Sequence, residues 1–182
     1  MQKRETTIVN YSERQTNLSD HELEVYFLFC VAVAGKRASV VARKVDALAE
    51  YIGQPFLKRV TVTDMRIFAL GKYDMMQRML DYFSSIEDPG AWLRTASLED
   101  LLRIPAVGNK TARFFLTHCL GANDYAIIDT HVKRWLSEIG HPINGLSYSD
   151  LEKIFLYEAK KREMSPSTLD LLIWRQSSGD FK

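Results

Sequence analysis

The chain has 182 residues, of which 46% are hydrophobic and 26% are charged, and its formal net charge at pH 7 is +1. This composition suits a globular protein with a substantial core, and it excludes a strongly basic chain whose nucleic-acid partner could be inferred from overall charge. No apolar run approaches the roughly 20 residues that a membrane span needs, so we expect no membrane partner.

The N-terminus and the cysteines indicate a cytoplasmic protein. The opening stretch MQKRETTIVNYSERQ lacks the apolar centre of a secretory signal. Cys30 and Cys119 are the two cysteines of the sequence, and they form no CxxC pair. They therefore predict neither a disulfide framework nor a zinc or iron–sulfur site, and we expect no metal or other cofactor.

Helix-start signals of one kind recur along the chain. In a capping box, a serine at the N-cap and an acidic residue three positions later each bond the other's backbone N–H group. Three pairs have this spacing: Ser19 with Glu22, Ser97 with Asp100, and Ser149 with Glu152. Ser165 followed by Pro166 predicts a further N-cap and first helical residue.

Apolar residues after these starts recur at helical spacing, and glycines follow several of the runs. Ala112, Phe115, Leu116 and Cys119 follow the i, i+3, i+4, i+7 pattern, and the segment 132–139 repeats it. Strand-like alternation does not extend beyond a few residues. The prediction is an all-α protein of about nine to eleven short helices, with stop signals at Gly53, Gly71 and Gly140.

Residues 97–119 are predicted to form two short helices joined by a tight hairpin, Pro105-Ala-Val-Gly108. The free N–H groups at the start of the second helix form an anion site that suits a DNA phosphate and reads no base. A helical hairpin with a solvated charged rim is the alternative. The basic residues near the hairpin in sequence are Arg103, Lys110, Arg113, His131, Lys133 and Arg134.

Lys110 lies near the start of the second of these helices, where the helix dipole disfavours a cation, so it is either a solvated side chain or a group held beside an anion. The segment YAIIDTHVKRWL (125–136) then returns toward it, and Asp129 is the expected N-cap of the next helix. An amine and a carboxylate in one site can serve as nucleophile and charge stabiliser. A salt bridge without chemistry remains the alternative.

The stretch LLRIPAVGNKTARFFL, followed by AIIDTHVKRWL, resembles the helix-hairpin-helix DNA glycosylase superfamily, which includes endonuclease III and the 8-oxoguanine DNA glycosylases. In that family a catalytic lysine lies two residues after the last hairpin glycine and an aspartate follows about nineteen residues later; Lys110 and Asp129 match both positions. FCVAVAGKRASVVARKVDAL and LGKYDMMQRML resemble earlier family segments. The tail LDLLIWRQSSGDFK is similar to the compact second branch of 8-oxoguanine glycosylases, best known from archaea.

This resemblance covers most of residues 20–182 and implies a two-lobed helical bundle with the active site in the cleft between lobes. Residues 1–35 and 141–182 would form one lobe, and 36–140 the lobe with the hairpin motif. The implied function is a bifunctional glycosylase/AP lyase that flips out and excises 8-oxoguanine from double-stranded DNA through a lysine Schiff base, followed by β-elimination. We expect a monomer that has no iron–sulfur cluster and that associates with the nucleoid through DNA. A glycosylase for another base, or a catalytically silent DNA-binding module, remains the alternative.

The resemblance and the side-chain chemistry also suggest binding residues. Trp174 has a planar face for stacking on a base, or else packs in the core. The α-carboxylate of Lys182 could accept both Watson–Crick donors of 8-oxoguanine, although most chain ends have no such role. Lys36 and Arg37 follow Ala34–Gly35 at the position where relatives insert a side chain into the gap left by the flipped nucleotide, or else they form an ordinary charged first helical turn. The residues expected to bind DNA are Lys36, Arg37, Val107, Gly108, Arg113 and His131.

Two departures from the family pattern bear on DNA contact. Ala106 replaces the usual first hairpin glycine, so a positive φ there would carry strain. Met75 and Met76 stand where relatives are often more basic, which puts part of the DNA-contact surface in doubt.

Overall fold

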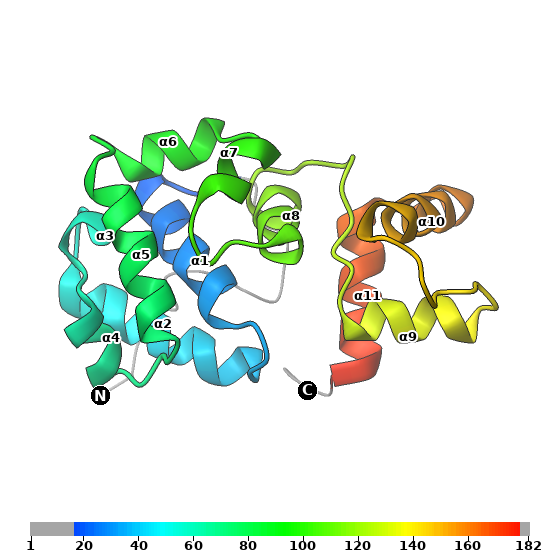
Figure 1. The fold of residues 1–182 in the computed structure, drawn as a ribbon, viewed down its shortest axis with the longest axis horizontal. Helices are drawn as coiled ribbons and strands as arrows, with labels where there is room; N and C mark the ends of the chain where they lie inside the picture. The colour runs from blue at the N-terminus through cyan, green and yellow to red at the C-terminus, as the bar shows by residue number, and fades with distance from the viewer. Residues whose placement is uncertain (1–16, 179–182) are drawn as a thin grey trace, which may run out of the picture. The chain divides into compact units, whose positions relative to one another are not determined.

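The computed structural model describes residues 17–178, and within that range the chain forms eleven α-helices and no strand (Figure 1). The all-α prediction is therefore confirmed. The described residues group into two compact units, Asn17–Ala106 and residues 107–178. The helices of the first unit are α1 (Asp20–Ala32), α2 (Ala38–Ile52), α3 (Phe56–Arg59), α4 (Val62–Ile67), α5 (Tyr73–Ser84), α6 (Pro89–Thr95) and α7 (Leu98–Arg103).

The first unit is built around α1, which packs against α2, α3 and α6. Every residue of α1 from Leu23 to Ala32 is buried, including the charged Glu24. An apolar helix without a polar face is typical of a position inside a core. The Glu24 carboxylate accepts a hydrogen bond of 2.5 Å from the backbone N–H of Leu57, which satisfies the one acid that α1 buries.

The second unit contains α8 (Asn109–Cys119), α9 (Thr130–Glu138), α10 (Tyr148–Lys161) and α11 (Pro166–Ser178). Helix α11 packs against α8, α9 and α10, and Figure 1 shows it beside α9 and α10. Its Leu169 and Ile173 share a core with Leu136 of α9 and Phe155 of α10. Burial of these side chains stabilises each by about 1.5–3 kcal/mol relative to exposure.

This division differs from the predicted lobes, whose boundaries followed residues 35 and 140. In the structure, α8 and α9 group with the helices that follow residue 140, because both pack against α11. The described residues contain no helix that is both long enough and apolar enough to cross a membrane.

Most of the predicted helix boundaries are confirmed. The capping boxes Ser19–Glu22 and Ser97–Asp100 both form, at α1 and α7. Ser165 accepts a hydrogen bond from the backbone N–H of Thr168 at 3.2 Å, as an N-cap does.

One capping prediction is wrong. Helix α10 starts two residues earlier than expected, with Ser147 as N-cap and Asp150 completing the box. Glu152 points into the unit instead and binds Arg113. A buried arginine is a stronger partner for a carboxylate than an exposed helix end, because a charge-assisted bidentate pair supplies two hydrogen bonds.

Candidate active site

The predicted hairpin forms at residues 104–108, between the end of α7 at Arg103 and the start of α8 at Asn109. Ala106 has φ 74°, so the strain expected for this non-glycine residue is present and costs about 1 kcal/mol. Gly108 is the exposed N-cap of α8 and offers no side-chain cap, and the first turn of α8 has no acidic residue. The start of α8 therefore has the properties of an anion site.

Lys110 and Asp129 lie together, as the sequence predicted. The Nζ atom of Lys110 is 3.7 Å from Oδ2 of Asp129, and the side chains are 43% and 14% exposed. The other carboxylate oxygen, Oδ1, accepts a hydrogen bond of 2.8 Å from the backbone N–H of Val132. Asp129 is thus both the N-cap of α9 and the charge partner of Lys110, and each role uses its own oxygen.

A second pair, which is buried and which the sequence did not reveal, lies near enough for the charges of Lys110 and Asp129 to act on it. Nε2 of His118, on α8, is 3.1 Å from Oδ2 of Asp170, on α11. Burial raises the pKa of Asp170, and the negative charge of Asp129 raises it further, while the hydrogen bond from His118 and the charge of Lys110 lower it. The one hint of this pair in the sequence is that the acidic Asp170 stands inside the apolar run of α11, next to Leu169.

Arg113 does not occupy the place predicted for it. The Arg113 side chain is 10% exposed. Its Nε and Nη2 atoms donate to the two carboxylate oxygens of Glu152 at 2.7 and 3.0 Å. Nη1 donates to the side-chain oxygen of Asn109 at 2.7 Å. This corrects the prediction that Arg113 binds DNA, because a guanidinium engaged in this way inside the unit has no exposed face for a phosphate.

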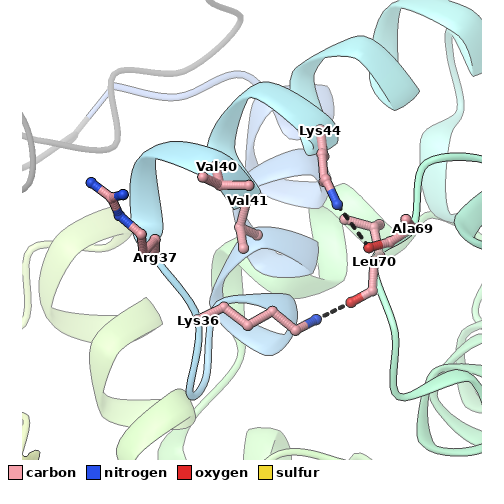
Figure 2. A pocket seen from close by; sticks show the side chains of 7 residues that line it. All are labelled: Lys36, Arg37, Val40, Val41, Lys44, Ala69 and Leu70. Atoms are coloured by element: carbon pink, nitrogen blue, oxygen red, sulfur yellow. Dashed lines mark hydrogen bonds between the residues drawn. The ribbon is translucent and has the colours of Figure 1, made fainter.

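Lys36 and Arg37 lie in the first unit, where both line a small pocket of about 260 Å³ (Figure 2). The ammonium group of Lys36 donates to the carbonyl of Leu70, and that of Lys44 donates to the carbonyl of Ala69 at 3.0 Å. Burial lowers the pKa of Lys36, as do the positive charges of Lys72 and Lys44. Arg37 points away from the two ammonium groups in Figure 2 and is exposed.

The remaining predicted residues lie on several elements. Val107 is buried in the hairpin. His131 is partly buried in the first turn of α9, and its Nδ1 lies 3.1 Å from Nη2 of Arg134. Trp174 is partly buried on α11. Lys182 lies outside the described residues.

Met75 and Met76, which stand where relatives are often more basic, differ in their exposure to solvent. Met76 is fully buried in the first unit, whereas Met75 is exposed. Position 76 is therefore part of a core in this chain, and an apolar residue there follows from packing.

Curated relatives match part of the chain, while no protein-family model matches it. An 8-oxoguanine DNA glycosylase/AP lyase of Thermoplasma volcanium is 37% identical over 75 residues, which cover 40% of this chain and 36% of that protein. A protein of the same name from Metallosphaera sedula is 36% identical over 84 residues, covering 44% and 41%. The matches thus span about two fifths of these relatives or less.

Solved structures match over a greater length. The Methanocaldococcus jannaschii 8-oxoguanine glycosylase/lyase, in complex with DNA containing 8-oxoguanine, has a TM-score of 0.72 at 23% identity, covering 91% of this chain and 85% of that one. The 8-oxoguanine DNA glycosylase of Thermotoga maritima has a TM-score of 0.68 at 22% identity, covering 89% and 82%. The predicted resemblance to the 8-oxoguanine DNA glycosylases is confirmed by these matches, and the chain has the fold of those proteins.

Proposed function

We propose that this chain is a DNA glycosylase with AP lyase activity that excises 8-oxoguanine from double-stranded DNA. The observation that carries the proposal is the placement of the Lys110 amine 3.7 Å from the Asp129 carboxylate, close in sequence to the hairpin. The curated relatives that match part of the chain are named 8-oxoguanine DNA glycosylase/AP lyase. The lesion base would be extruded from the duplex, because its sugar is otherwise out of reach.

In the first step the Lys110 nitrogen, after losing one proton, attacks C1′ of the damaged nucleotide. The N–C1′ bond forms as the bond from C1′ to the base breaks, and the base leaves with the bonding electrons and takes up a proton. Positive charge develops on the sugar during this step. The Asp129 carboxylate would stabilise that charge, and groups of this kind contribute about 10²–10³-fold to rate.

In the second step the sugar ring opens to a Schiff base between Lys110 and C1′. Loss of a proton from C2′ then allows the C3′–O bond to break, and the 3′ phosphate departs. Water hydrolyses the remaining imine and restores the lysine. The partial exposure of the Lys110 side chain (43%) leaves room for a sugar to approach it.

Docking of the duplex is assigned to the start of α8. The exposed Gly108 and the N–H groups behind it would bind a backbone phosphate, with Val107 shaping the loop. His131, Lys36 and Arg37 are proposed as further DNA contacts, and Trp174 and Lys182 as the residues that recognise the flipped base.

Borohydride trapping tests the proposal. Sodium borohydride reduces a Schiff base to a stable amine, so the protein should become covalently attached to a duplex that carries 8-oxoguanine opposite cytosine. Lys110→Gln should abolish both the adduct and strand cleavage while duplex binding is kept. Lys160→Gln, which changes an exposed lysine of α10, is the matched control and should trap at the native rate. Trapping that persists without Lys110, or none by the native protein, contradicts the proposal.

A further inference from the structure

The segment that carries Asp129 is buried but is not part of a helix. Ala126, Ile127 and Ile128 are all buried, and the segment belongs to no helix or strand. Within the segment, the backbone N–H of Asp129 donates to the carbonyl of Ile127 at 3.1 Å. Buried backbone N–H and C=O groups must find hydrogen bonds, because leaving one unsatisfied costs about 1–3 kcal/mol. The partners of this segment therefore determine where Asp129 lies.

Two side chains of α10 supply those partners. The hydroxyl of Tyr148 accepts from the backbone N–H of Ile128 at 3.0 Å and donates to the carbonyl of Ala126 at 2.9 Å. Oε1 of Glu152 accepts from the N–H of Ala126 at 2.8 Å. Burial raises the pKa of Tyr148 to about 12, so its hydroxyl keeps the proton that it donates. Positions 148 and 152 are one turn apart on α10 and thus act on the same face.

The same glutamate binds the helix that carries Lys110. Oε1 of Glu152 accepts from Nε of Arg113 at 2.7 Å, and Oε2 accepts from Nη2 at 3.0 Å. The Arg113 guanidinium also lies over the Tyr148 ring, 4.7 Å from its centre. Arg113 is three residues after Lys110 on α8. One carboxylate oxygen is thereby shared between α8 and the segment that ends at Asp129.

The ion pair of Lys110 and Asp129 is too weak to set its own geometry. Its atoms are 3.7 Å apart and the lysine is 43% exposed, and a pair of this kind is worth about 0–1 kcal/mol. Catalysis needs reacting groups placed within about 0.5 Å. The position of the amine relative to the carboxylate must therefore come from the elements that carry them.

We infer that Tyr148, Glu152 and Arg113 are positioning residues, which hold the Asp129 segment against α8 so that Lys110 and Asp129 face one substrate atom together. This inference rests on the proposed function. None of the three residues is assigned a contact with DNA. Their role is to fix the distance between nucleophile and charge stabiliser.

Single-turnover trapping on a duplex that carries 8-oxoguanine opposite cytosine tests the inference, because the adduct forms only after base departure, the step in which Lys110 and Asp129 act on the same sugar. Tyr148→Phe removes the hydroxyl and leaves the ring. Glu152→Gln keeps the shape but loses the charge that binds Arg113. We expect either variant to lower the trapping rate at saturating DNA by about 10–100-fold, with the dissociation constant for the duplex changed by less than about threefold.

Two matched variants of the same helix separate positioning from a general loss of stability. Tyr157→Phe removes a hydroxyl from an exposed tyrosine. Glu158→Gln neutralises a buried glutamate that binds His141 at 3.1 Å and Arg162, away from the Asp129 segment. Both controls should trap at close to the native rate, measured well below each melting temperature.

The possible outcomes distinguish this inference from the proposed function. If the native protein traps DNA and the 148 and 152 variants, folded by circular dichroism, trap equally fast, the three residues are structural and the inference is wrong. Slow trapping by Glu158→Gln to the same degree would also overturn it, because any loss in α10 would then suffice. If the native protein forms no adduct, the proposed function itself fails and the inference with it. Tyr148→Phe carries the test alone if Glu152→Gln does not fold.

Discussion

Replacement of Asp129 by asparagine separates its two roles, since asparagine keeps a capping oxygen and removes the charge. The bond from the Val132 N–H, 2.8 Å long, can be retained, because asparagine and aspartate are equally good N-caps. The variant loses the attraction of the carboxylate for the helix start and for Lys110. We expect a large loss of base excision with little loss of stability.

The size of each effect follows from the geometry. The charge at the start of α9 is worth about 0.3–1 kcal/mol, and the partly exposed pair with Lys110 adds about 0–1 kcal/mol. Neutralising Asp129 also relieves its repulsion of the buried Asp170, which offsets part of the cost. The expected change in unfolding free energy is about 1 kcal/mol, or roughly 2–4 °C in Tm. Loss of transition-state stabilisation should lower excision by about 10²–10³-fold.

The assay is single-turnover excision of 8-oxoguanine from a duplex, run beside differential scanning calorimetry. Asp88→Asn is the matched control, because Asp88 caps α6 through the N–H of Ala91 at 3.0 Å in the other unit. It should leave excision unchanged. A variant at position 129 that excises within about threefold of the native rate, or that melts more than about 10 °C lower, refutes the reasoning and makes Asp129 a structural cap.

Three further predictions concern the hairpin and the buried acid. Ala106→Gly should raise the unfolding free energy by about 0.5–1 kcal/mol, since glycine adopts φ 74° without strain; a lower Tm in calorimetry contradicts this. Gly108→Glu should weaken binding to lesion and plain duplexes alike, because its carboxylate repels the DNA phosphate. Gly108→Gln should weaken binding less, because it carries no charge and a Cβ at this position meets no atom within 4 Å. Equal affinities of the two variants in fluorescence anisotropy would place the DNA elsewhere. Burial is the main cause that raises the pKa of Asp170 in the folded protein. Protonated Asp170 therefore contributes favourably to the free energy of folding below the unfolded-state pKa of about 3.9, and this contribution is lost as pH rises through the folded-state pKa. Asp170→Asn should therefore gain stability relative to the native protein as pH rises from about 4 to 7, and a constant difference in denaturant midpoint would contradict that cause.

Local patterns were sufficient for most of the helix starts and for the candidate pair Lys110 and Asp129. Capping boxes and apolar spacing involve residues within two turns of one another, so they can be recognised without knowledge of the fold. Lys110 and Asp129 were identified because the first follows the hairpin and the second caps the next helix, both of which are local features. The resemblance to the family hairpin marked Ala106 as a position where a positive φ would carry strain, and the structure has that positive φ.

Tertiary structure decided which charged groups are used inside the protein and which remain available. Arg113 resembles a member of the basic rim in sequence, and Glu152 resembles a capping residue, yet they bind each other across 39 positions. His118 and Asp170 pair across 52 positions. Ion pairs between side chains so far apart leave no periodic signal, since they depend on how α8, α10 and α11 pack. The sequence alone therefore determines the helices and the two candidate reactive groups, while packing determines the buried contacts that hold those groups in place.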